Sequence, residues 1–129
     1  MRFMMIIYPN EQAEAGVMPT AQEVSAMMVF NKELIDSGKL LSADGLHPSS
    51  RGARVRFKDG KPTVTDGPFT QTREVLGGYW IIQVDSKEEA IEWAKRVPLM
   101  DDQSFLELRQ IFDPEDFPAD VRKAAGYES

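Results

Sequence analysis

The 129-residue chain contains no cysteine and only one histidine. The lack of cysteine excludes a disulfide framework and every site that needs a thiolate, whether nucleophilic or metal-binding. The single histidine excludes a multi-histidine zinc site within one subunit. A carboxylate-only Mg²⁺ or Ca²⁺ site stays open, although no acidic stretch has the spacing of a calcium-binding loop. We therefore expect neither a metal nor another cofactor.

Clustered basic residues and long apolar runs are also missing. The net charge is −6 and the pI about 4.8, and the densest basic stretch, 51–61, alternates with apolar residues as a solvated strand does. Phosphate-backbone binding needs clustered Lys and Arg, so we expect no nucleic-acid partner. No apolar run approaches the ~20 residues of a membrane span. The N-terminal segment 1–8 lacks the features of a signal peptide, so we expect a cytoplasmic protein.

What the chain does have is enough apolar material for a core, 42% of its residues. Its length predicts a single domain over 1–129. The segment 113–129 is acidic and interrupted by proline, and we expect it to form an irregular C-terminal arm or short helix. No internal linker suggests a second domain.

The hydrophobic patterns predict strands alternating with helices. Two capping boxes, Thr20 with Glu23 and Ser86 with Glu89, open two helices, and Asp59-Gly60 is a strong hairpin signal. The predicted strands are 2–8, 40–46, 54–58, 62–65, 79–84 and 105–112; the predicted helices are about 21–37 and 87–97, with a polar loop over 9–19. This order is typical of an α+β, ferredoxin-like split βαβ fold, in which an antiparallel sheet carries two helices on one face and here a hairpin insert.

Such a sheet leaves its second face open. Depending on the register, that face carries residues such as Phe3, Phe57, Tyr79 or Ile81. An exposed apolar face is a predicted interface, and covering it with a second copy gives a two-fold homodimer.

The most informative local feature is the stretch Asp66 to Arg73. Pro68 restricts its own backbone and that of Gly67, so the turn is stiff and holds the Asp66 carboxylate in a set direction. Two interpretations stay open: Asp66 accepts hydrogen bonds within its own turn, or it points into a ligand pocket formed with Gly67, Pro68 and Phe69.

His47 is the second candidate, because it is the only side chain that ordinarily titrates near neutrality and it follows a predicted strand. It is either a solvated loop residue or, if it meets Asp66, half of a proton-transfer pair. Further candidate ligand contacts are Arg54, Arg73, Glu74 and Tyr79. Arginine and glutamate in such places are equally compatible with surface ion pairs.

Three motifs together support a family resemblance. Leu41 to Pro48, Val64 to Phe69 and Leu76 to Ile81, with the helix 88–94, resemble the YCII-related family, in its subgroup named for the Asp-Gly-Pro-Phe motif. The similarity runs from the first strand to about Phe112.

The resemblance implies a ferredoxin-like fold that pairs into a dimeric α/β barrel and an active-site cleft with an Asp and a His. The wider family includes an enzyme that removes chloride from a chlorinated muconolactone without a cofactor. Subgroup members are often encoded beside extracytoplasmic-function sigma factors, which implies a regulatory link. The aspartate corresponds to Asp66. The family histidine lies in the first helix, which has none here, so His47 could fill that role only from another strand end.

Three functions therefore remain as hypotheses. The chain is a cofactor-free enzyme doing Asp66/His47 acid-base chemistry on a small carbonyl or lactone, a non-catalytic binder of a small molecule, or a regulatory partner of a basic protein such as a sigma factor.

Overall fold

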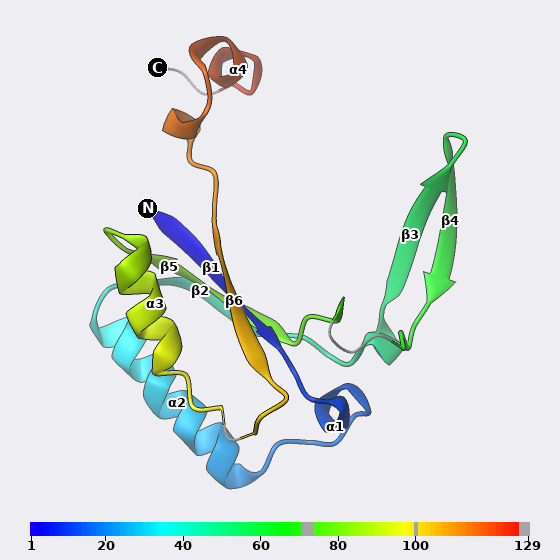
Figure 1. Cartoon of the computed structure of the whole chain (residues 1–129), viewed down its shortest axis with the longest axis vertical. Helices are drawn as coiled ribbons and strands as arrows, with labels where there is room; N and C mark the ends of the chain where they lie inside the picture. Colours follow the sequence, from blue (N-terminus) through cyan, green and yellow to red (C-terminus); the bar gives the residue numbers. More distant parts are fainter. Residues whose placement is uncertain (71–73, 100, 127–129) are drawn as a thin grey trace.

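The fold is built around a central strand, β1 (Arg2–Tyr8), in a computed structural model that describes residues 1–70, 74–99 and 101–126. β1 pairs antiparallel with β5 (Gly78–Gln83) on one side and β6 (Phe105–Gln110) on the other. β2 (Leu40–Gly45) pairs with the outer edge of β5, giving the order β2-β5-β1-β6. Two longer helices, α2 (Ala21–Asp36) and α3 (Lys87–Lys95), cover one face (Figure 1). The α+β class is confirmed, and the arrangement is consistent with a ferredoxin-like fold.

The core lies between this sheet and the two helices. Phe3 and Met5 of β1 and Trp80 and Ile82 of β5 face the helices and are nearly inaccessible to solvent. From α2, Phe30 packs edge-on against Trp80, with ring centroids 5.7 Å apart. Other members of this buried cluster are Leu34, Val84, Ala90 and Val97. Burial of these apolar side chains is the main stabilising contribution to the fold.

Two of the residues expected on the open sheet face lie elsewhere. Tyr79 and Trp80 do point to opposite faces: Trp80 belongs to the core, whereas Tyr79 and Ile81 lie on the face without helices. Phe3, a candidate for that open face, is instead in the core because its register places it opposite Ile82. Phe57 is not in this sheet at all. Of the four candidates for the open face, Tyr79 and Ile81 are therefore the two that lie on it.

The predicted hairpin insert is confirmed as a separate two-stranded sheet of β3 (Ala53–Lys58) and β4 (Lys61–Asp66). Both residues of its tight turn have positive φ, 52° at Asp59 and 75° at Gly60, as a two-residue hairpin turn requires. Figure 1 shows this hairpin projecting away from the four-stranded sheet and its helices. All its residues except Arg54 are exposed.

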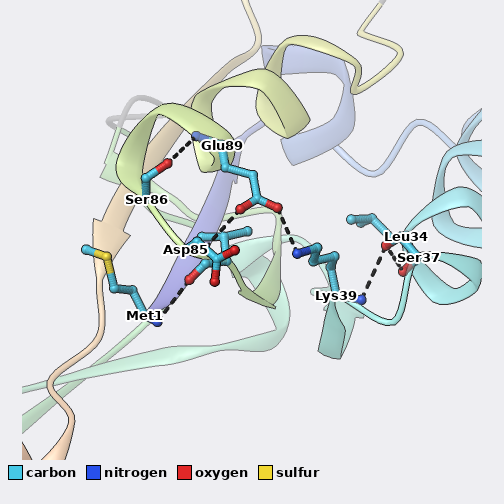
Figure 2. A network of polar contacts seen from close by, with 8 residues as sticks. Met1, Leu34, Ser37, Lys39, Asp85, Ser86 and Glu89 are labelled. Carbon is cyan, nitrogen blue, oxygen red and sulfur yellow. Dashed lines mark hydrogen bonds and ion pairs between the residues drawn. The ribbon is translucent and has the colours of Figure 1, made fainter.

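Polar caps hold the helix ends in place. The Thr20–Glu23 capping box is present, but the second box is only half formed. The Ser86 hydroxyl accepts from the Glu89 amide, while the Glu89 carboxylate accepts from the amide of Asp85 and pairs with Lys39 at 2.9 Å (Figure 2). This carboxylate therefore links the start of α3 to the chain entering β2.

Two short segments gain structure that the sequence patterns did not predict in detail. The expected loop 9–19 contains a helix of one turn, α1 (Glu11–Glu14), capped by the side chain of Asn10. The C-terminal arm contains a 3₁₀ turn, η3 (Pro114–Asp116), and a short helix, α4 (Ala119–Ala124), beyond the sheet (Figure 1).

Candidate functional site

A cavity of about 370 Å³ lies where the base of the hairpin meets the body of the protein. Its wall comes from the end of β2, the 3₁₀ helix η1 (Ser49–Arg51), the start of β3, the turn after β4 and the segment before β5. The apolar lining residues are Leu46, Pro48, Phe69, Val75 and Leu76. The polar ones are His47, Ser49, Arg51, Arg54 and Glu74, with Gly52 completing the wall.

The Asp-Gly-Pro-Phe turn (residues 66–69) forms one wall because it is packed directly onto η1. The Gly67 amide donates to the carbonyl of Gly52 at 3.0 Å. A Cβ atom at Gly67 would overlap the backbone carbonyl of Ser49, so only glycine permits this approach. The Phe69 amide donates to the Ser49 hydroxyl at 2.9 Å. The motif therefore attaches the base of the hairpin to η1 through these contacts.

Ser49 in turn is held by a buried carboxylate. The Ser49 amide donates to Glu14 at 2.7 Å, and its hydroxyl donates to the other carboxylate oxygen. Both residues are more than 90% buried, and a carboxylate in such a place must be hydrogen-bonded to be tolerated. The unpredicted helix α1 thus supplies Glu14 as the anchor of η1.

Two arginines give the cavity its charge. The Arg54 guanidinium lies over the Phe69 ring, 3.9 Å from its centroid, which is a cation–π geometry. Arg51 also lines the cavity. Neither has a carboxylate partner within salt-bridge distance in the described residues. Glu74 adds one carboxylate to the same wall, so the two guanidinium groups leave a net positive charge that suits an anionic ligand.

His47 lies on the cavity wall just beyond the end of β2, as its position after a strand suggested. Its Nε2 is 3.4 Å from Nη1 of Arg51. Arginine N–H groups can only donate, so a hydrogen bond in this contact requires Nε2 as its acceptor. The ring is exposed and therefore accessible to a molecule in the cavity.

Asp66, the other half of the hypothetical pair, is the last residue of β4, where it pairs with Ala53. It is exposed and is not among the lining residues. Its carboxylate has no hydrogen-bond partner in the described part of the chain. The structure therefore places His47, but not Asp66, on the cavity wall.

The remaining candidates divide between the cavity and other places. Phe69, Arg54 and Glu74 line it, whereas Gly67 and Pro68 are not among its lining residues. Tyr79 is on the open sheet face, where its hydroxyl donates to Asp44 at 3.1 Å. Arg73 lies outside the described residues.

Sequence reasoning missed Ser49, Arg51 and the anchor Glu14. Arg51 follows His47 by four residues just after a predicted strand, and this proximity in the sequence could have indicated that both line one site. No local sequence pattern indicated the role of Glu14, because its partner Ser49 is 35 residues away in the sequence. Among residues 1–70, 74–99 and 101–126, no group of three or more His, Asp and Glu side chains is arranged to hold a metal ion.

Comparison with known proteins places these features in a family context. A family model described as the YCII-related domain matches residues 1–114. An uncharacterized protein of Rhizobium meliloti (strain 1021), R00369, is 32% identical over 69 residues, which are 54% of this chain and 56% of that protein. This chain thus spans little more than half the length of that relative. Within the described residues, no helix combines the length and the apolar character needed to cross a membrane.

Proposed function

We propose that the cavity at the hairpin base binds a small organic anion. The chain belongs to the YCII-related family, whose model matches residues 1–114. The observation that carries the proposal is the pair of arginines, Arg51 and Arg54, facing an otherwise largely apolar wall. A volume of about 370 Å³ is in the usual range for sites that take small molecules. The Asp-Gly-Pro-Phe turn supports placing the chain in the subgroup named for that motif.

The ligand class follows from the wall chemistry. A carboxylate would pair with the guanidinium groups, since planar N–H forks match carboxylate oxygens. The apolar part of the molecule would contact Leu46, Val75 and Leu76. A small aromatic or unsaturated carboxylate satisfies both requirements, whereas a neutral isostere satisfies only the second.

The test uses benzoate as the probe and benzamide as its neutral counterpart, followed by backbone amide shifts in NMR titrations. Benzoate should perturb residues 46–54 and 74–76, and benzamide should bind at least tenfold more weakly because it forgoes the charge-assisted bonds. Arg51→Gln and Arg54→Gln should each weaken benzoate by about tenfold or more. Arg56→Gln, on the same strand but away from the cavity, is the matched control. Equal binding of both probes would contradict the proposal.

Cofactor-free proton transfer on a small carbonyl or lactone is a second candidate function. The observation that favours it is the position of His47 on the cavity wall, with its Nε2 3.4 Å from Nη1 of Arg51. His47 would be the base, and Asp66 would orient it or supply the acid, as the sequence suggested. A neutral imidazole close to a bound carbonyl compound is a common general base.

The test measures turnover of a simple lactone by the parent chain and by two variants, His47→Gln and Asp66→Asn. Loss in both variants by similar factors would support the pair. Loss in His47→Gln alone would leave His47 as the base without Asp66. Saturable binding with no turnover in the parent would leave the chain a binding protein.

A further inference from the structure

The hairpin β3–β4 is a sheet of two strands, so each strand has one neighbour and one open edge in the described part of the chain (Figure 1). Its two turn residues both have positive φ, as in a two-residue turn, whose flanking pair, Lys58 and Lys61, is hydrogen-bonded. At the other end of the hairpin, the Gly67 amide donates to the Gly52 carbonyl, in phase with the same alternation. The register therefore fixes which backbone groups point inward and which point outward.

The two edges of this hairpin are not equivalent. Val55–Val64 and Phe57–Pro62 are non-hydrogen-bonded pairs, whose N–H and C=O groups point away from the partner strand. On β4, Pro62 has no N–H to offer, and a proline is one of the usual protections of an exposed edge. On β3, the N–H and C=O groups of Val55 and Phe57 point outward and have no hydrogen-bond partner within the described residues. β3 is therefore the edge that is open to a further strand.

The side chains of β3 define the kind of strand that fits beside it. Val55 and Phe57 lie on one face of the hairpin, and Phe57 is 75% exposed. Arg56 and Lys58 lie on the other face, and neither has a carboxylate within salt-bridge distance in the described residues. A matching strand has apolar residues beside Val55 and Phe57. The residues between these, which lie beside the two cations, are acidic.

We propose that the open edge of β3 binds an extended segment of another protein in which acidic and apolar residues alternate. Main-chain hydrogen bonds would supply the affinity of such an added strand, and the alternating side chains its specificity. Charge disfavours the β3 edge of a second copy as the occupant, because Arg56 and Lys58 would then lie beside like charges. The proposal is independent of any ligand in the cavity.

The hairpin is locally basic although the chain as a whole is acidic. Residues 53–66 contain four Lys and Arg but two Asp and Glu residues, whereas the net charge of the chain is −6. The hairpin projects away from the four-stranded sheet and its helices (Figure 1), and salt screens charges that lie more than about 10 Å away. An acidic segment at β3 therefore experiences mainly the basic side chains of the hairpin.

The probe is a peptide with blocked ends that alternates glutamate and valine and has the length of β3, 6 residues. It is titrated into the full chain, and backbone amide shifts are followed by NMR. The shifts of residues 53–58 should change more than those of residues 61–66. A peptide with lysine in place of glutamate should bind at least tenfold more weakly, because it places like charges beside Arg56 and Lys58.

Two N-methylated forms of the probe separate strand addition from charge attraction alone. One form is methylated on its valine amides and the other on its glutamate amides, so that their charges are identical. In an added strand only one of these sets of amides faces β3. One form should therefore lose at least tenfold in affinity while the other keeps it. Equal affinities of the two forms would overturn the proposal.

Proline substitutions test the edge from the side of the protein. Val55→Pro removes an outward N–H of β3, and Val64→Pro removes its cross-strand counterpart on β4, at positions where a strand tolerates proline. Val55→Pro should weaken binding of the probe at least tenfold, and Val64→Pro, the matched control, less than threefold. Amide shifts of the hairpin show whether each variant folds, and the methylated probes decide the question if Val55→Pro does not.

Three results would contradict strand addition at β3. Equal losses in the two folded proline variants would mean that β3 is not the docking edge. A larger loss in Val64→Pro would assign the site to β4 instead. Failure of the unmodified probe to bind would overturn the proposal as a whole, and shifts of the hairpin amides with anionic lipid vesicles would then identify a membrane surface as its partner.

Discussion

The helix-covered sheet and the hairpin base are organised by different forces. In the sheet, Phe3, Trp80 and Phe30 belong to a buried core whose contacts are apolar. At the hairpin base, a few polar links hold the structure: Glu14 to Ser49, and Ser49 to the Phe69 amide. Burial decides stability in the first region. In the second, individual hydrogen bonds decide the position of the cavity wall, so single substitutions there should change function more than folding.

The largest expected effect is in the core. Leu34→Ala should lower the free energy of unfolding by about 2–5 kcal/mol, since Leu34 is completely buried between α2 and the sheet. Val64→Ala on the exposed hairpin should change it by less than about 0.5 kcal/mol. Urea unfolding measures both. Similar losses for the two variants would remove the contrast between the regions.

Ser49→Ala is the next largest expected change and tests the polar links. It removes the hydroxyl bond to Glu14 and leaves a buried carboxylate with a single partner, which should cost about 3 kcal/mol, the upper part of the range for an unsatisfied group. Ser50→Ala, the exposed neighbour, should be nearly neutral. Urea unfolding gives the stability, and the amide shift of Gly67, whose own bond to Gly52 the substitution does not remove, reports whether the wall moves. Equal stability of the two variants would mean that Glu14 does not anchor η1.

Gly67→Ala tests the attachment of the hairpin base to η1 by steric overlap. Its Cβ would overlap the Ser49 carbonyl, so we expect a loss of about 1–3 kcal/mol. Gly52→Ala is the matched control, because its Cβ would lie 3.6 Å from the same oxygen, an ordinary contact. Thermal unfolding compares the pair. A harmless Gly67→Ala would show that the turn can move away from η1.

The two regions also differ in how far the sequence predicts them. Apolar periodicity and local caps such as Thr20 predicted the strands and helices of the sheet, and Asp59-Gly60 predicted the hairpin. These signals are local, so the chain carries them within a few residues. The face on which Phe3 lies depends on strand register, which no local pattern specified.

The cavity was less predictable because long-range polar contacts build it. His47, Arg54, Phe69 and Glu74 were candidates that do line it, but their common wall depends on Glu14 reaching Ser49 across 35 residues. The stiff turn at Asp66 was found from the sequence, whereas its role in fastening Gly67 to η1 was not. Close backbone approach leaves a glycine as its only sequence signal.

The smallest expected effect concerns pH and returns to the sheet region. The amide of Asp85, and then the Lys39 ammonium, lower the pKa of Glu89 from its ordinary value of 4.5. A carboxylate with a lowered pKa in the folded state contributes stability that is complete above its unfolded-state pKa and is lost as the pH falls through the folded-state value. The hydrogen bond to Glu89 raises the pKa of Lys39, so that contribution is lost only when the pH rises beyond the ordinary lysine range.

Glu89→Gln isolates this contribution, because the amide oxygen can still accept from Asp85 while the charge is removed. The parent should lose more stability than the variant between about pH 5 and pH 3, measured by urea unfolding. Glu92→Gln on the same helix is the control. Its ion pair with Lys95 is exposed and should contribute little, so this variant should follow the parent. If the curve of Glu89→Gln also follows the parent, the link between α3 and β2 does not depend on the charge of Glu89.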